Sequence, residues 1–256
     1  MLDVVCDIII IVSVVIAANL VSWIVDRTWH PSKRRIHNDL IAWQVGTLGT
    51  IYAVIIGFML LTVWTKYDAA QANADLEANT LVSINRIAVN LSPSQKDEIQ
   101  KAAREYVDFM IRREWPDMEH RQAAHDSDRL MRRLNKAILA GKPSDPAQNV
   151  LLDHAVTELS TMTECRRMRQ TQCNAELPVV LWFILVLGGT VTILISCLLG
   201  TESKCLHVLL ISALSFMITL SIVAIADINQ PFQGATHVAP TGFIRASQTL
   251  QEENGS

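Results

Sequence analysis

The 256-residue chain lacks the short motifs that mark the common classes of enzyme and cofactor site. It contains no CxxC pair, so neither a dithiol redox motif nor a zinc site of that kind is indicated. No phosphate loop, GxSxG or HExxH sequence occurs, and the histidines are scattered along the chain. We therefore expect a protein that is not an enzyme, with no catalytic residues, no cofactor and no metal site.

The chain also lacks a basic start and any strong excess of charge. Its first residues, MLDVVCD, carry no Lys or Arg before an apolar run begins. A cleaved signal peptide has a basic start, so we expect this run to be retained. Residues 66–175 hold 16 Lys and Arg against 16 Asp and Glu. Such a balance gives no reason to expect nucleic acid as a partner.

Long apolar runs dominate what is present. They occupy residues 4–25, 40–64, 178–199 and 206–226, and each has close to the roughly 20 residues that a helix needs to cross a bilayer. No convincing strand-like alternation occurs between them. The sequence therefore predicts an all-α integral membrane protein in the lipid bilayer, with four transmembrane helices and a helical-bundle insert between helices 2 and 3.

Three parts follow along the chain. Residues 1–65 form a first transmembrane hairpin, residues 66–177 a polar four-helix bundle, and residues 178–256 a second hairpin with a Pro- and Gly-containing C-terminal segment at the membrane interface. Within the insert, apolar residues such as Leu81, Ile84 and Ala88 recur at helical spacing. We expect membrane helices 2 and 3 to extend into the bundle without a break.

Basic residues indicate how the chain crosses the membrane. The loop after the first run holds Arg27, Lys33, Arg34 and Arg35, and the loop between the last two runs adds Lys204. Because cytoplasmic loops carry an excess of Lys and Arg, both loops are expected in the cytoplasm. The insert then lies on the non-cytoplasmic side, and the bacterial inner membrane is the expected location.

The second apolar run has a face of small and hydroxyl-bearing residues. Its candidate functional positions are Gln44, Gly46, Thr47, Thr50, Ala53 and Gly57. Glycine lowers helix propensity by about 1 kcal/mol relative to alanine, so the repetition needs a reason. One interpretation is close helix packing between small residues. The other is a narrow conduit whose wall exposes backbone and threonine oxygens to a permeant inorganic ion.

The segment that follows the last apolar run is the second concentration of candidate residues. Asp227 lies where this helix leaves the apolar region, and Pro231, Phe232 and Gly234 follow it. We expect an interfacial cap or a short re-entrant piece here. Asp227 either attracts cations at a vestibule or bonds to the backbone of the following turn.

Three stretches of the chain resemble a known family. They are GTIYAVIIGFMLLTVWTKYDAAQANADLEANTL, REWP and DINQPFQGATHVAPTGF, and they are similar to the bestrophin-like domain family of bacterial and plant membrane proteins. The family-motif positions outside the C-terminal segment are Trp64, Tyr67, Glu77, Trp115, Pro116, Pro178 and Trp182. The resemblance spans nearly the whole chain.

This resemblance implies a function at the level of the fold. Bestrophins are pentameric anion channels with four membrane helices per subunit, so the second helix becomes the expected pore wall and a homo-oligomer the expected assembly. Two features depart from bestrophins: the face from Gly46 to Gly57 has no run of bulky apolar residues, and bestrophins keep their helical region in the cytoplasm. The leading hypothesis is an oligomeric ion channel. The alternative is a membrane sensor or scaffolding subunit whose insert binds a ligand or partner.

Overall fold

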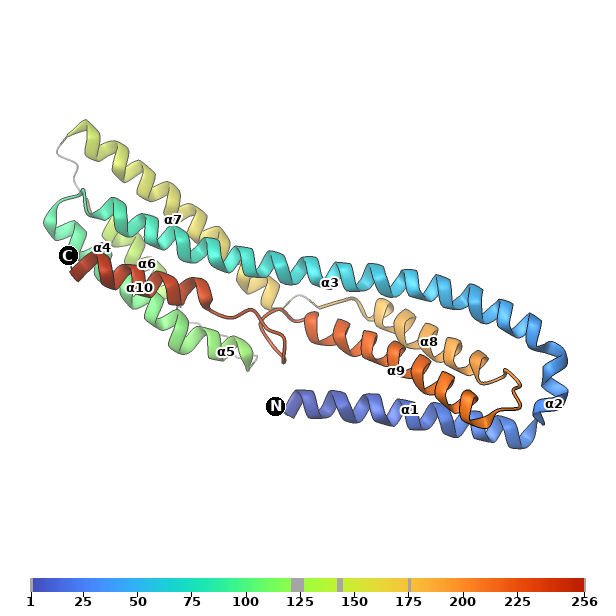
Figure 1. Cartoon of the computed structure of the whole chain (residues 1–256). Helices are drawn as coiled ribbons and strands as arrows, with labels where there is room; N and C mark the ends of the chain where they lie inside the picture. The colour runs from blue at the N-terminus through green and yellow to red at the C-terminus, as the bar shows by residue number, and fades with distance from the viewer. Residues whose placement is uncertain (1, 121–126, 142–144, 175, 256) are drawn as a thin grey trace. The chain divides into compact units, whose positions relative to one another are not determined.

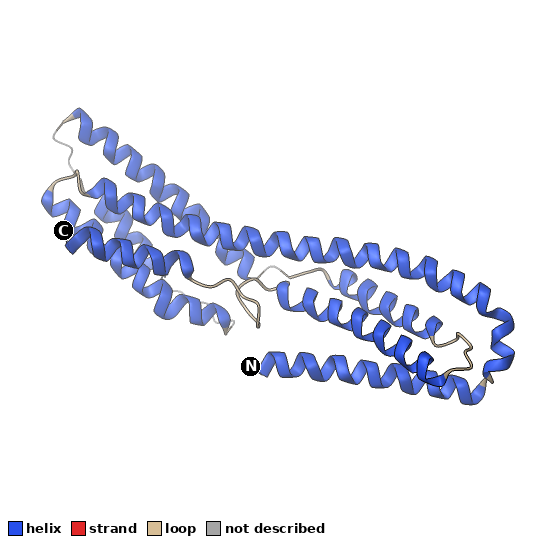
Figure 2. Cartoon of the chain, in the orientation of Figure 1, coloured by secondary structure: helices blue, strands red, loops and turns tan. Residues whose placement is uncertain are grey.

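The structure is a computed structural model that describes residues 2–120, 127–141, 145–174 and 176–255. Within these ranges the chain forms helices joined by turns and loops, and no strand is present (Figure 2). The helices in the first half are α1 (Leu2–Thr28), α2 (Pro31–Arg34), the 3-10 helix η1 (Arg35–His37) and α3 (Asn38–Ala88). Next come α4 (Pro93–Phe109), the π-helical segment η2 (Met110–Glu114), α5 (Trp115–Glu119), α6 (Ser127–Leu139) and α7 (Pro146–Cys173). The chain continues with α8 (Val179–Ser196), α9 (Lys204–Ile228) and α10 (Thr241–Gly255).

Four of the described helices are long and apolar enough to span a membrane. The spans lie in Val4–Thr28, Arg35–Ala88, Val179–Ser196 and Lys204–Ile228. Large apolar side chains on them, such as Ile16 and Val179, are exposed on the single chain. Exposure of that kind is favourable in lipid and costly in water. The prediction of an all-α membrane protein with four apolar helices is thus confirmed.

The first compact unit consists of residues 1–65 and 176–229, so the part of α3 after Thr65 belongs to the second unit. Within it, α9 packs against both α1 and α8, as Figure 1 shows. Tyr52 of α3 fixes a close approach to α8, because its hydroxyl donates a hydrogen bond of 2.8 Å to the Leu185 carbonyl. A Cβ atom on Gly189 would lie 2.8 Å from the Tyr52 hydroxyl oxygen, so this contact requires glycine.

The second compact unit consists of residues 66–175 and 230–256. Helix α4 shows why its helices pack: Ile99, Ala102, Ala103, Tyr106 and Val107 share one face at helical spacing, and all are buried. Pro93 at its first turn and Pro146 at the start of α7 begin helices where a missing N–H costs nothing. The Asp145 side chain caps α7 by accepting a bond from the Gln148 N–H.

Two predictions about this region need correction. Helix α3 is continuous from Asn38 to Ala88, as expected for membrane helix 2, but α7 ends at Cys173 and α8 begins only at Val179. Pro178 is the N-cap of α8, and its ring prevents an unbroken helix from α7. The residues after 240 form helix α10, whose Phe243, Ala246 and Leu250 are buried in the second unit. The C-terminal segment therefore groups with the bundle rather than with the second hairpin.

Candidate functional site

The candidate residues of α3 lie on a face that the chain itself leaves uncovered. Gln44, Gly46, Thr47, Thr50, Ala53 and Gly57 are all exposed. A Cβ atom added to Gly46, Gly49 or Gly57 would meet no atom within 4 Å. Packing between helices of one subunit therefore does not explain these glycines. Lipid, another subunit or a conduit must cover this face.

The opposite face of α3 is the one that packs. Tyr52, Met59 and Val63 are buried, and Met59 and Val63 form an apolar cluster with Leu185 and Ile225. The family-motif residue Trp182 packs against the same cluster. Tyr52, Met59 and Val63 lie one or two turns apart on the far side of the helix from Thr50 and Gly57. The helix thus has a packed face and an open face.

A buried ionic cluster lies in the second unit, and the family-motif residue Glu77 belongs to it. Arg169 of α7 donates to both oxygens of Glu77, at 2.8 and 3.2 Å, and to Glu114 at 2.8 Å. The three side chains are at most 3 % exposed. One guanidinium thus joins α3, η2 and α7 through charged hydrogen bonds that water does not weaken.

Tyr106 completes this cluster from α4. Its hydroxyl donates a hydrogen bond of 2.6 Å to Glu77. Burial, and then the negative charge of Glu77, raises the pKa of Tyr106 well above its usual value, so the phenol stays neutral. Burial acts to lower the pKa of Arg169, but Glu77 and Glu114 outweigh it and hold that pKa above its usual range. With two carboxylates and one guanidinium in the cluster, the Glu114 Oε2 atom is buried without a hydrogen-bond partner in the part of the chain that the structure describes.

Trp115, next to the cluster, connects the bundle to the C-terminal segment. Its indole N–H donates a hydrogen bond of 2.9 Å to the Val238 carbonyl, and its ring meets those of Phe232 and Phe243 at centroid distances of 5.7 and 5.5 Å. The backbone N–H of Trp115 closes a π-helical turn by donating a hydrogen bond to the Met110 carbonyl. Such a turn holds one residue more than an α-helical turn, which lets Glu114 and Trp115 both face the interior.

The residues of the predicted interfacial cap divide between the two compact units. Pro231 and Phe232 are buried, and Phe232 belongs to the core of the second unit. Gly234 has a φ of 82°, a left-handed conformation that favours glycine, in the turn that leads to Val238. Asp227 lies in the last turn of α9 and belongs to the first unit. The structure thus places the four residues in two different units.

The remaining family-motif residues lie outside the ionic cluster around Arg169. The Tyr67 hydroxyl donates to the His237 carbonyl at 3.3 Å, within the second unit. Pro116 lies in the first turn of α5 and Pro178 at the N-cap of α8. Trp64 is exposed on α3. Glu77, Trp115 and Phe232, which are far apart in sequence, meet in or beside one buried site.

Comparison with known proteins shows which family the sequence matches. The family model of the Bestrophin-like domain matches residues 12–243. The chain belongs to the Bestrophin-like domain family. A sequence search of curated proteins found no match.

Solved structures show the same fold as this Bestrophin-like domain protein. Two variants of a bacterial bestrophin homologue from Klebsiella pneumoniae match with a TM-score of 0.69 at 16 % and 17 % identity, over 96 % of this chain and 99 % of theirs. A structure described as a membrane protein matches at a TM-score of 0.65 and 16 % identity, with the same coverage. At such identity the likeness concerns the fold alone.

Sequence reasoning missed most of the ionic cluster. Glu114 follows Arg112 and Arg113 in a charged stretch, yet it is buried. Arg169 and Tyr106 were not expected to meet Glu77, because sequence spacing relates residues on one helix and these residues come from different helices. A usable signal was the spacing of Met110, Glu114 and Met118, four residues apart, which places the carboxylate on the same helix face as two buried methionines.

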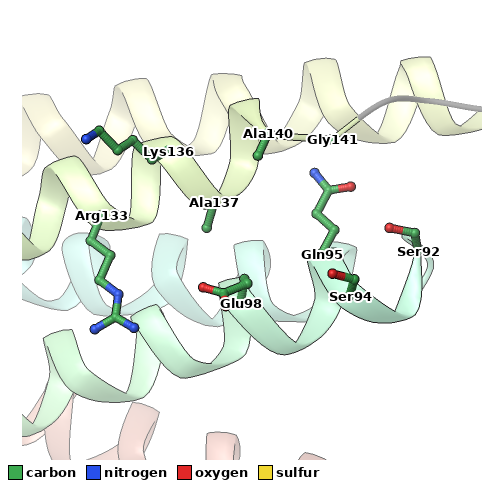
Figure 3. Close-up of a pocket in the computed structure, with 9 residues that line it drawn as sticks. All are labelled: Ser92, Ser94, Gln95, Glu98, Arg133, Lys136, Ala137, Ala140 and Gly141. Carbon is green, nitrogen blue, oxygen red and sulfur yellow. The ribbon is translucent and has the colours of Figure 1, made fainter.

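The bundle of this Bestrophin-like domain protein also has a polar pocket between α4 and α6, with a volume of about 510 Å³ (Figure 3). Ser92, Ser94 and Gln95 line it from the start of α4, and Arg133 and Lys136 from α6. Part of this wall is already engaged, since Gln95 donates to the Ile138 carbonyl at 2.9 Å and Arg133 pairs with Glu105. The pocket is a candidate for a small polar ligand of the insert.

Proposed function

We propose that the protein is the subunit of a homo-oligomeric membrane ion channel in which the open face of α3 lines the conduit. The observation that carries the proposal is the asymmetry of α3. The face with Tyr52, Met59 and Val63 packs against the rest of the first unit. Gly46, Thr50 and Gly57 lie on the open face, where a Cβ added to either glycine meets no atom within 4 Å and where Val54 and Leu61 are also exposed. Family membership supports it, because the family is named for its likeness to bestrophins.

The chemistry of this face suits ion passage. Thr47 and Thr50 donate their hydroxyl protons to carbonyls one turn earlier, at 3.0 and 2.8 Å. Their oxygen lone pairs therefore remain available to replace water around an ion. Glycine adds no side chain, so several copies of α3 approach a common axis closely. One helix face cannot enclose a conduit, which is why the proposal requires symmetric copies of the chain.

In the proposed channel, Asp227 and the helical insert lie outside the conduit itself. Asp227, in the last turn of α9, contributes negative charge at one end of the spans. The helical insert, which follows membrane helix 2 and precedes membrane helix 3 in the sequence, lies outside the bilayer. It is on the non-cytoplasmic side of a bacterial inner membrane. The basic loops around Lys33 and Lys204 support this orientation. Labelling of an introduced exposed cysteine in α7, such as Thr157→Cys, by a membrane-impermeant thiol reagent on intact cells tests the side.

Planar-bilayer recording of the purified oligomer tests the channel directly. We expect conductance from the native protein and a large loss of it in Gly57→Phe, because the ring would fill the open face. Val186→Phe is the matched control, since Val186 is exposed on the membrane helix α8. Intact oligomers that conduct under no salt or pH condition would refute the proposal.

A sensor is the second candidate function, and the pocket between α4 and α6 favours it. In that role, ligand binding beside Ser94 and Lys136 would change the bundle, to which α3 belongs along part of its length. The two functions predict different behaviour: a sensor requires a partner that co-purifies with it, whereas a channel conducts alone.

A further inference from the structure

We propose that the groove between α1 and α9 binds one anionic phospholipid, with its phosphate beside Arg27 and Lys204. The groove is separate from the open face of α3, and lipid binding there does not depend on ion conduction. The groove consists of two adjoining cavities in the first unit. One is polar and has a volume of about 630 Å³; the other is apolar and has a volume of about 490 Å³.

The polar cavity has an excess of positive charge. Asp26 pairs with the buried Arg34, and Glu202 pairs with Arg35, so both carboxylates on the cavity wall are neutralised. Arg27 and Lys204 also line the cavity, and neither forms an ion pair within the described residues. A phosphodiester carries one negative charge, and these two cations can each give it a charge-assisted hydrogen bond.

Unused hydrogen-bonding atoms point to a ligand independently of this charge. His207 is only 5 % exposed and lines the polar cavity, and its Nε2 atom has no hydrogen-bond partner among the described residues. The Oδ1 atom of Asn19, on the same cavity wall, is buried and unpartnered as well. Buried polar atoms are normally hydrogen-bonded. A headgroup that offers both phosphate oxygens and hydroxyl groups, such as phosphatidylglycerol, satisfies both atoms.

The apolar cavity continues the groove in the direction that an acyl chain takes. It is lined by Val12 and Ile16 of α1 and by Leu209 and Phe216 of α9, among others. From Val12 to Trp23 along α1 the distance is about 16 Å, at 1.5 Å per residue. Asn19 links the two cavities, because its amide donates a bond of 2.9 Å to Ser212 on the apolar wall. A free phosphate ion would leave this second cavity unfilled.

Exposed tryptophans place the polar cavity at headgroup level. Trp23 and Trp29 near the end of α1 and Trp43 near the start of α3 are between 41 % and 68 % exposed. Tryptophan is enriched where hydrocarbon meets water. Arg27 stacks over the Trp23 ring at 5.4 Å, which keeps its charge at that level. A phospholipid therefore has its phosphate and its chain at the depths where the groove is charged and apolar.

The test uses the full-length protein, purified in detergent and examined by native mass spectrometry with added dioleoyl phosphatidylglycerol. We expect one lipid to be retained per chain. The double variant Arg27→Gln/Lys204→Gln should weaken its binding about thirtyfold. Lys33→Gln is the control, because Lys33 of α2 is exposed close to Arg27 in the sequence but does not line the cavity.

Two further arms identify the ligand and the groove. Ala213→Phe fills the apolar cavity from an exposed position and should also release the lipid, whereas Leu210→Phe, exposed on the same helix outside the cavity, should not. Inorganic phosphate at the same concentration should neither bind nor displace the lipid. An equal loss of lipid binding in Lys33→Gln and in the double variant would overturn the proposal. Binding of inorganic phosphate alone would also overturn it. A change of oligomeric mass in Ala213→Phe without lipid loss would assign the groove to a neighbouring subunit and also overturn it.

Discussion

Replacing Arg169 by methionine removes the only positive charge in the buried cluster described for the second unit. Arg169 makes three hydrogen bonds to Glu77 and Glu114, and all three side chains are at most 3 % exposed. Removal of one partner from a buried ion pair costs about 4 kcal/mol, because the other charge stays buried without compensation. Here two carboxylates lose their counter-ion, so we expect at least this loss of stability in the second unit.

Hydrogen exchange, measured by mass spectrometry on the purified protein, reports this loss locally. A change of about 4 kcal/mol in the free energy of opening corresponds to exchange about a thousandfold faster. The increase should appear in peptides from α4 and α7. Peptides from α8 and α9, in the first unit, serve as the internal reference. Arg167→Met is the matched control, since Arg167 is 78 % exposed and its ion pair with Glu164 is worth less than about 1 kcal/mol.

The cause of the destabilisation can be tested by neutralising the carboxylates. Adding Glu77→Gln and Glu114→Gln to Arg169→Met removes the uncompensated charges and should recover most of the lost protection. Lower pH should act in the same direction in the single variant. Burial raises the pKa of an unpaired carboxylate, so the protonated folded state is favoured at low pH, and this stability is lost as pH rises through the folded pKa. Unchanged exchange in Arg169→Met, or equal changes in Arg167→Met, would refute the reasoning.

Three other perturbations have defined outcomes. Gly189→Ala should destabilise the first unit by about 2 kcal/mol, because its Cβ meets Tyr52 and Ile218 at 2.8 and 2.9 Å, whereas Gly46→Ala, with open space around it, should leave thermal stability unchanged or higher. Trp115→Phe should cost about 1 kcal/mol by leaving the buried Val238 carbonyl without its donor, and faster hydrogen exchange in α10 would show it. Above pH 10 the second unit should lose stability, because the folded pKa of Tyr106 lies above 10 and the neutral phenol is the favoured form; Tyr106→Phe should remove that part of the pH dependence in an unfolding titration.

The membrane helices were predictable because their signal is local. Each span carries its own run of apolar residues, and the bilayer thickness fixes the length that is required. The helices of the bundle were predictable for a similar reason, since Leu81, Ile84 and Ala88 recur with the helical period. Uniform hydropathy, however, did not reveal which face of α1 or α9 packs.

The missed features depend on contacts between distant segments. Helix α10 has a polar composition, and only burial of Phe243 and Leu250 against the bundle explains its place in the fold. Glu114 and Arg169 are 55 residues apart, and no spacing rule pairs them. The break between α7 and α8 had a local signal in Pro178, since the residue before a proline disfavours helix. At this position the conformational restriction by proline outweighs the helical periodicity on either side.

The central claim is that the open face of α3 lines an ion conduit, and charge-selective modification of Thr50 tests it most directly. In a background where the exposed Cys6 and Cys205 are replaced by serine, Thr50→Cys is treated with positively or negatively charged thiol reagents during bilayer recording. The account predicts that the two reagents shift ion conductance or selectivity in opposite directions, and that Val186→Cys responds to neither. Equal responses at the two positions, or no response at Thr50→Cys despite complete labelling, would contradict it.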